Sequence, residues 1–277
     1  MRHIIWDMGG TLVNTYPEVD RVLCEAAFGD AEPEHVRHVT SLTRRSIAHA
    51  IATLAVEHDL APRVFEEAYA GLKERWRHRP APVMDGAREV MARGLEVCHD
   101  LGAPVIQLAG YYCYYEDPNP DAERWYGQLL ADAVPMAARL GVVMGIENVD
   151  GTDVTSIRKA MEFVDAVGSP YLQVYPDLGN IAEQQLDPAV ELTAGEGHMV
   201  AMHAKDVRPG EPRRVEMGVG TVDWSRSFEL LRAQHWAGRL MIEMWNDDAP
   251  DSVARCIDAR EFIEDRAASA GIPVLAP

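Results

Sequence analysis

The stretch Val142-Val143-Met144-Gly145-Ile146-Glu147 is a short apolar run that ends in a carboxylate. Three later runs have the same form: Tyr171-Leu172-Gln173-Val174-Tyr175-Pro176-Asp177, Met199-Val200-Ala201-Met202-His203 and Arg239-Leu240-Met241-Ile242-Glu243. Their final residues are 30, 26 and 40 positions apart, counted from 147 to 177, then 203, then 243. Each gap is close to the length of one strand plus one helix, so the runs are predicted to be consecutive parallel strands.

Glu147, Asp177, His203 and Glu243 are therefore expected at one edge of a parallel sheet. In a barrel of strand–helix units, the carboxyl ends of the strands form the face at which active sites are built. Three carboxylates and one imidazole suit manganese, zinc, cobalt or magnesium better than a soft metal. We predict a divalent metal site, and the alternative is that each residue is only a polar strand end.

Strands and helices are predicted to alternate from about residue 86 onward. The predicted strands cover 104–109, 142–147, 171–177, 199–203 and 239–244, and the predicted helices cover 87–101, 120–140, 153–167, 187–195, 224–234 and 250–269. This alternation is typical of an α/β protein with a parallel sheet and crossover helices. A further strand at residues 3–7 makes six, whereas a closed TIM barrel has eight. We predict an incomplete TIM-barrel-like sheet, either closed irregularly by the N-terminal segment or open and covered by helices or a partner subunit.

Residues 1–86 have a different pattern, with one strand followed by helices. Apolar residues at the helical period mark faces over 47–55 and 64–76. Pro80 and Pro82 then interrupt helical continuity, since proline lacks an amide donor and restricts the residue before it. We therefore predict two domains, 1–86 and 87–277.

Composition restricts the classes of partner. The chain has 277 residues, 47% of them hydrophobic, and a formal net charge of −18. Such a charge repels phosphate backbones and anionic membranes, so we expect neither nucleic-acid nor membrane binding. Its four cysteines are scattered, as is typical of reduced thiols, and no apolar run reaches about 18 residues. A cytoplasmic protein is expected, and the pattern leaves a homo-oligomer open.

The second segment carries motifs that resemble a known family, the L-ribulose-5-phosphate 3-epimerases (L-xylulose-5-phosphate 3-epimerases), which are TIM-barrel enzymes acting on sugar phosphates. The resemblance runs from about Ala87 to Gly271 and extends to the ketohexose 3-epimerases. It rests on Ile106-Gln107-Leu108-Ala109-Gly110-Tyr111, Tyr114-Tyr115-Glu116, Ile146-Glu147-Asn148, Val174-Tyr175-Pro176-Asp177-Leu178-Gly179-Asn180, His203-Ala204-Lys205-Asp206, Gly218-Val219-Gly220-Thr221-Val222-Asp223-Trp224 and Ile242-Glu243-Met244-Trp245.

The resemblance implies roles for the four strand-end residues. All four would bind the divalent metal, and Glu147 and Glu243 would also be the acid/base pair of a C3 epimerisation. The chemistry needs these residue types, because a metal acidifies the C3 proton, one carboxylate removes it and a second returns a proton to the opposite face. The alternative for both glutamates is plain ligation without proton transfer.

Two further positions are secondary candidates. Arg213 or Arg214 would bind substrate hydroxyl or phosphate oxygens, although exposed loop arginines are often only solvated. Asp206 could orient a metal ligand or form a simple surface ion pair.

The first segment resembles another family, the haloacid dehalogenase superfamily of phosphatases. The resemblance rests on Ile4-Ile5-Trp6-Asp7-Met8-Gly9-Gly10-Thr11-Leu12-Val13-Asn14-Thr15 and on Met84-Asp85-Gly86-Ala87. It implies a chimeric chain in which the first three strand–helix units of the epimerase family, with a phosphate-binding arginine loop, are absent. Asp7 would be the nucleophile, but Gly9 stands where those phosphatases have their proton-donating aspartate.

Three functions follow from these motifs. The first is a metal-dependent 3-epimerase acting on a small sugar phosphate. The second is a catalytically inactive scaffold or interaction protein stabilised by its metal, and the third is a phosphatase using Asp7.

Overall fold

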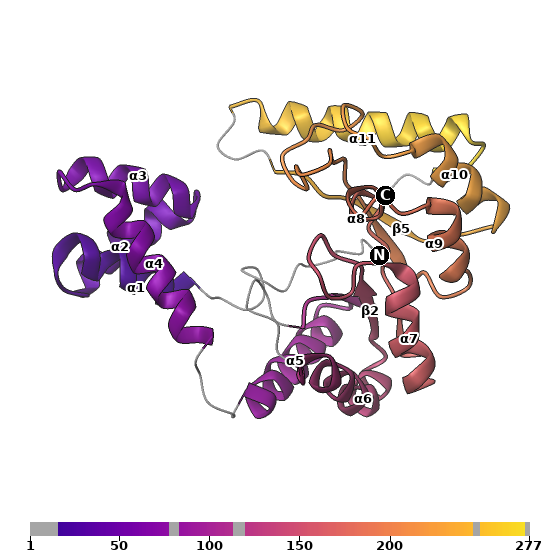
Figure 1. The fold of residues 1–277 in the computed structure, drawn as a ribbon, viewed down its shortest axis with the longest axis horizontal. Coiled ribbons are helices and arrows are strands. Elements are labelled where there is room, and N and C mark those ends of the chain that lie inside the picture. The colour runs from indigo at the N-terminus through magenta and orange to yellow at the C-terminus, as the bar shows by residue number, and fades with distance from the viewer. Residues whose placement is uncertain (1–15, 78–82, 113–119, 246–249, 275–277) are drawn as a thin grey trace. The chain divides into compact units, whose positions relative to one another are not determined.

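The computed structural model describes residues 16–77, 83–112, 120–245 and 250–274. These residues separate into two compact units, each considered by itself (Figure 1). One holds helices α1–α4, and the other holds all the described strands. The division falls in the first turn of helix α5 (Val83–Asp100), between Asp85 and Gly86. The assignment of two domains at residue 86 to two different families stays a prediction.

The helical unit is built around one apolar core. It consists of α1 (Tyr16–Phe28), α2 (Pro33–Thr43), α3 (Ile47–Glu57) and α4 (Pro62–Arg77). The helix starts follow local chemistry: α2 and α4 begin at prolines, whose missing amide hydrogen needs no partner there, and the Ser46 side chain accepts a hydrogen bond from His49 N at the start of α3. Leu23, Val39 and Phe65 are fully buried in its core.

The second unit alternates strands and helices. Its elements are α5 (Val83–Asp100), β1 (Val105–Ala109), α6 (Ala122–Leu140), β2 (Val143–Glu147), α7 (Ile157–Val167), β3 (Leu172–Val174), α8 (Leu178–Glu183), α9 (Pro188–Ala194), β4 (Ala201–Ala204), α10 (Trp224–Ala233), β5 (Arg239–Ile242) and α11 (Ser252–Ser269). Glycines in the left-handed conformation end α6 and α7, at Gly141 and Gly168.

All strand pairs are parallel, as predicted. β1, β2 and β3 form one sheet in that order, and β4 and β5 form another. Two isolated parallel bridges, Val174 with Met199 and Asp177 with His203, connect β3 to the β4 segment. Among the described residues the strands do not close into a barrel, which confirms the predicted incomplete sheet with crossover helices. The strand predicted at residues 3–7 lies outside the described residues.

The β1–β3 sheet is covered by helices. α6 and α7 pack against β2, and α7 also packs against β3. Met144 and Ile146 of β2 are fully buried, and Gly145 between them is buried too, so the strand reads as a continuous apolar run. Glu147 is the next residue of this buried strand and its last.

Two predicted elements have different bounds in the structure, and one helix was missed. The strand predicted at 171–177 is continuous only over β3, with an isolated bridge at Asp177, and residues 178–183 form α8, a helix that the sequence did not predict. The helix predicted at 153–167 begins at Ile157, because the Ser156 side chain caps it by accepting a hydrogen bond from Lys159 N.

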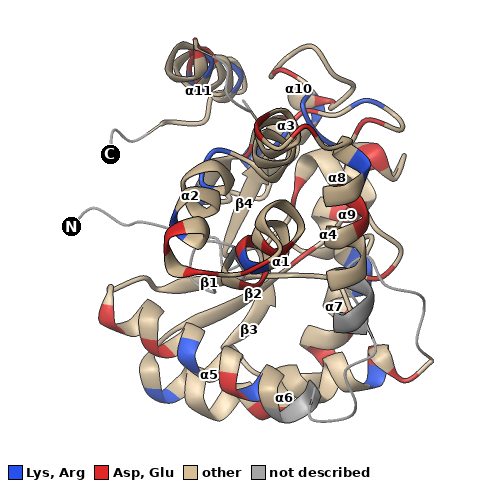
Figure 2. Ribbon diagram, turned by 90° about the vertical axis from the view of Figure 1, so that its left-hand side faces the viewer, with Lys and Arg blue, Asp and Glu red and all other residues tan. Residues whose placement is uncertain are grey.

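Acidic residues occur on helices throughout the described chain (Figure 2). Within the described residues, no helix combines the length and apolar character needed to cross a bilayer.

Candidate metal centre

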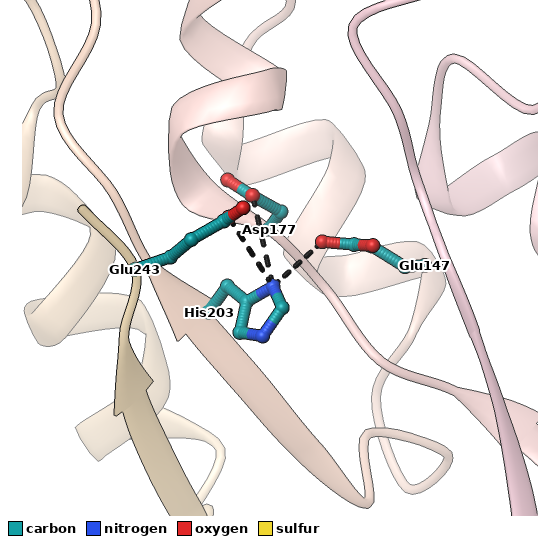
Figure 3. A group of neighbouring side chains, drawn as sticks. All are labelled: Glu147, Asp177, His203 and Glu243. Atoms are coloured by element: carbon teal, nitrogen blue, oxygen red, sulfur yellow. Dashed lines mark hydrogen bonds and ion pairs between the residues drawn. The ribbon is translucent and has the colours of Figure 1, made fainter. Parts of the chain in front are cut away.

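Glu147, Asp177, His203 and Glu243 meet at the carboxyl ends of the strands (Figure 3). Glu147 is the last residue of β2, Asp177 precedes α8, His203 lies in β4 and Glu243 directly follows β5. One ligand atom from each lies within 4.8 Å of the other three. The structure thus brings together all four residues that the sequence selects.

His203 lies at the centre of the cluster. Its Nδ1 atom is 2.6 Å from Glu147 Oε1, 3.4 Å from Glu243 Oε2 and 3.9 Å from Asp177 Oδ2. Glu243 and Glu147 contact the same nitrogen, from the left and the right of the view (Figure 3). Nδ1 is therefore the histidine nitrogen that faces the carboxylates.

Burial and mutual charge shift the pKa values of the cluster. Burial raises the pKa of Glu147, and burial with the charge of Asp177 raises the pKa of Glu243 to about 7. Burial alone would lower the pKa of His203, but its hydrogen bond to Glu147 and the surrounding carboxylates raise it to about 9. The metal-free protein therefore holds a protonated imidazole among three carboxyl groups.

Neighbouring side chains hold two of the ligands in place. Gln107 Nε2, from β1, donates a hydrogen bond to Glu147 Oε2. Asn148 brackets the Asp177 backbone, since its Oδ1 accepts from Asp177 N at 2.9 Å and its Nδ2 donates to Asp177 O at 3.1 Å. Asn180 N in turn donates to Asp177 Oδ1 at 2.9 Å. These contacts orient ligands in the way that outer partners do in metal sites.

Lys205 is a fifth charged residue of the cluster. It is 4% exposed, and its Nζ atom lies 3.0 Å from Asp177 Oδ2 and 3.4 Å from Glu243 Oε2. α8 starts so close to this segment that a Cβ atom on Gly179 would lie 2.6 Å from Lys205 O, which explains the glycine there. Burial alone would lower the pKa of Lys205, but Asp177 and Glu243 raise it, so the ammonium stays charged.

The donor set fits a divalent cation. Asp177 Oδ2 and Glu243 Oε2 are buried and accept no hydrogen bond, so each has lone pairs available for a metal. Bond lengths from a zinc-like ion to oxygen or nitrogen are about 2.0–2.2 Å, so opposite ligand atoms would be at most about 4.4 Å apart. The cluster, with one atom from each residue within 4.8 Å of the others, is close to that size.

The two arginine candidates have different surroundings. Arg213 Nη2 lies 3.0 Å from Asp150 Oδ2, and the Arg213 guanidinium carbon is 5.6 Å from the ring centre of Trp245. Trp245 is two residues after the ligand Glu243, so Arg213 contacts the segment that carries this ligand. Arg214 is exposed, with a φ of 63°.

Asp206 orients no metal ligand and forms no surface ion pair. It is 2% exposed, and its carboxylate accepts hydrogen bonds from the backbone N–H groups of Gly218 at 2.8 Å and Gly220 at 3.0 Å. Further donors are Val207 N, Val222 N and Trp224 Nε1. Both expectations for this residue were wrong, since it anchors the loop before α10.

Sequence reasoning did not select Gln107 or Lys205 as site residues. Both lie inside motifs that resemble the epimerase family, but neither residue type has a spacing that indicates ligand support. Only their positions could have indicated a role. Gln107 lies in the strand predicted at 104–109, and Lys205 is two residues after the strand predicted at 199–203, which ends in a ligand.

Comparisons with known proteins identify the family. A profile described as "Xylose isomerase-like TIM barrel" matches residues 35–266. L-ribulose-5-phosphate 3-epimerase UlaE of Shigella boydii serotype 18 is 39% identical over 184 residues, which are 66% of this chain and 65% of that protein. UlaE of Escherichia coli K12 gives the same figures. The match therefore spans slightly less than two-thirds of the length of these curated relatives.

Solved structures show the same fold. L-ribulose 3-epimerase superposes with a TM-score of 0.58 at 18% identity, covering 67% of this chain and 68% of that one. D-psicose 3-epimerase, solved in the presence of D-fructose, gives 0.59 at 16% identity, covering 70% and 74%. The IOLI protein, solved with a bound zinc atom, gives 0.57 at 15% identity, covering 70% and 74%.

The resemblance of residues 1–86 to haloacid dehalogenase phosphatases stays a prediction. Its motif at residues 4–15, including Asp7 and Gly9, lies outside the described residues. The matched profile begins at residue 35, inside that segment, and continues into α11. Because the match covers more than half of the sequence, the chain belongs to the xylose isomerase-like TIM barrel family.

Proposed function

We propose that this chain is a metal-dependent 3-epimerase that interconverts ketose phosphates such as L-ribulose 5-phosphate and L-xylulose 5-phosphate. The observation that carries the proposal is the convergence of Glu147 and Glu243, from the ends of β2 and β5, in one four-residue cluster (Figure 3). The names of the curated relatives support the same substrate class.

Each side chain has a defined task in this reaction. Glu147, Asp177, His203 through Nδ1, and Glu243 would hold the ion. A divalent ion bound there supplies the positive charge that polarises the ketose carbonyl and acidifies the hydrogen on C3. One glutamate removes that proton, and the electron pair moves toward the carbonyl oxygen to form an enediolate. The other glutamate, as a carboxylic acid, returns a proton to the opposite face of C3 and inverts its configuration.

Gln107 and Asn148 support this division of work. Gln107 donates to Glu147 Oε2, so this oxygen is held in a fixed direction and does not depend on the His203 contact. Asn148 holds the backbone from which Asp177 projects. A proton-transfer group must lie within hydrogen-bond reach of the atom that it serves, and such supports keep it there.

Solvent exchange provides a direct test. The full chain, loaded with Mn²⁺, is incubated with L-ribulose 5-phosphate in deuterated water, and deuterium at C3 is followed by NMR. We expect exchange and formation of the epimer, and we expect Glu147→Gln and Glu243→Gln to reduce turnover by about 10²-fold or more. Glu162→Gln is the control, because Glu162 is an exposed partner of Lys159.

Metal analysis of each variant separates lost chemistry from lost metal. A folded, metal-loaded Glu147→Gln or Glu243→Gln variant that retains more than about a tenth of wild-type turnover would exclude that glutamate as an acid/base group. A metal-loaded wild-type chain with no exchange would instead favour the inactive scaffold, the alternative that the open strand arrangement supports. Phosphate release that disappears in Asp7→Asn would indicate a phosphatase.

A further inference from the structure

Lys205 forms ion pairs with one buried oxygen of each of two ligand carboxylates. Its Nζ atom is 3.0 Å from Asp177 Oδ2 and 3.4 Å from Glu243 Oε2. The Lys205 ammonium also lies 5.6 Å from the ring centre of Trp245. With 4% of its surface exposed, Lys205 is held inside the site and is not a flexible surface residue.

The positive charge of Lys205 offsets part of the negative charge of the ligand carboxylates. The three carboxylates of the cluster carry three negative charges when ionised, and a histidine that ligates a metal is neutral. Lys205 reduces the total to two negative charges, which a divalent ion neutralises. Arg213, the nearby arginine, is paired with Asp150 at 3.0 Å. Lys205 is thus the cation in direct contact with the ligand carboxylates.

We propose that Lys205 is a fixed counter-charge of the metal centre, which brings the metal-loaded site to zero net charge while all three carboxylates are ionised. It also connects the carboxylate before α8 to the carboxylate after β5, across the junction of the two sheets. Lys205 is a positioning residue, since it acts through Asp177, Glu243 and the charge of the site.

This role predicts an unusual direction of change. A cation beside a divalent ion repels it, so a neutral residue at position 205 strengthens divalent binding. A lysine that only held the ligands in shape would have the opposite effect, because its removal would let the carboxylates separate and would weaken binding. The sign of the change in affinity therefore distinguishes the two roles.

A second consequence rests on the proposed function. Transfer of the C3 proton to a glutamate moves one negative charge from that carboxylate onto the enediolate, and preorganised positive charge stabilises the charge there. Without Lys205 the loaded site would already carry a negative charge. A variant with a neutral residue at position 205 should then bind the metal tightly and have a lower kcat. The fall in kcat would not be explained by loss of metal.

Mn²⁺ binding to the purified full chain tests the inference without any sugar. We expect Lys205→Met and Lys205→Gln to bind Mn²⁺ about tenfold or more tightly in equilibrium dialysis. Lys205→Arg keeps the charge and should bind as the wild type does. Lys159→Met is the matched control, since Lys159 also bridges two carboxylates, at 2.6 and 2.7 Å, but on the surface. We expect no change in this control.

The variants also differ in stability. Without metal, Lys205→Gln should melt below the wild type because Asp177 and Glu243 lose their partner, and Mn²⁺ should raise its melting temperature by more than it raises that of the wild type. Weaker Mn²⁺ binding in folded Lys205→Gln would overturn the inference. Wild-type protein that binds Mn²⁺ but turns over no ketose would count against the proposed function and leave the charge result intact.

Discussion

The helical unit and the strand ends each bury an aspartate, and the two side chains differ in the hydrogen bonds that their oxygens accept. Asp20 of α1 is 3% exposed, and its two oxygens accept hydrogen bonds from Thr40 Oγ1 at 2.7 Å and Thr43 Oγ1 at 2.6 Å. Asp177 is 0% exposed, but its Oδ2 accepts no hydrogen bond and faces other charged groups.

The difference distinguishes structural from functional burial. A carboxylate whose two oxygens each accept a hydrogen bond from a neutral donor stabilises its own surroundings and does not need a cation to be buried. A buried carboxylate that is gathered with two others and left partly unsatisfied is costly in the metal-free protein, and a cation removes that cost. Asp206 supports the distinction. It lies three residues from His203, but its carboxylate accepts hydrogen bonds from backbone N–H groups, as expected for a structural aspartate.

The strongest test of this comparison exchanges each aspartate for asparagine and measures metal binding. Asp177→Asn removes one ligand charge, and we expect Mn²⁺ affinity to fall by more than about 100-fold, because even outer partners of metal ligands contribute 10–100-fold. At a Mn²⁺ concentration of about 100 times Kd, the wild type gains about 2.7 kcal/mol of stability, and the variant should lose this gain. Asp20→Asn should bind Mn²⁺ normally, and equal losses in both variants would refute the distinction.

A smaller effect is expected from the residue behind Asp177. Asn148→Ala leaves Asp177 N and O without their side-chain partners, in a buried place. We expect a loss of about 1–3 kcal/mol in the free energy of unfolding and about a tenfold loss of Mn²⁺ affinity. Urea unfolding and dialysis measure the two quantities. Gln184→Ala, which removes the side-chain hydrogen bonds to Val149 O and Gly151 O, is the control, and it should leave Mn²⁺ affinity unchanged.

Asp20 should affect stability alone. Asp20→Asn weakens two hydrogen bonds between α1 and α2, and we expect it to lower the free energy of unfolding by about 1–2 kcal/mol in urea. Glu25→Gln is the control, because Glu25 forms only an exposed ion pair with Arg21 and should change stability by less than about 0.5 kcal/mol. If Asp20→Asn left the free energy of unfolding unchanged, the hydrogen bonds from the two threonines would contribute no more stability than an exposed ion pair.

The four ligands could be predicted because each follows an apolar strand and the gaps have the length of one strand–helix unit. That pattern is local, so Glu147 and Glu243 were found although 96 positions separate them, from 147 to 243. The alternation of elements after residue 86 was predicted for the same reason, since parallel strands buried on both faces read as short apolar runs.

What was missed depends on partners rather than on pattern. Nothing in the residue type or spacing of Lys205 indicates that its ammonium contacts Asp177 and Glu243, because that contact needs β4, β5 and α8 in their final places. Asp206 was misjudged because its donors come from residues 207–224, whose loop has no periodicity. α8 was missed because its six residues are too few to show a helical period.

The smallest expected effect separates the two arginines that the sequence could not distinguish. Arg213 contacts Asp150 and lies beside Trp245, on the side of the ligand cluster, whereas Arg214 is exposed with a left-handed backbone. We expect Arg213→Gln to raise the KM for L-ribulose 5-phosphate about fivefold, which corresponds to about 1 kcal/mol for a partly exposed charged contact. Arg214→Gln should leave KM unchanged and is the matched control.

Unphosphorylated L-ribulose sharpens this last test. If Arg213 binds the phosphate, its substitution should leave the weaker turnover of the free sugar unaffected, because that substrate lacks the group concerned. An equal rise in KM for both substrates would mean that Arg213 contacts a sugar hydroxyl or acts by holding Asp150. A rise in KM confined to Arg214→Gln would place the phosphate on the exposed side of the loop, away from Trp245, and would refute the assignment to Arg213.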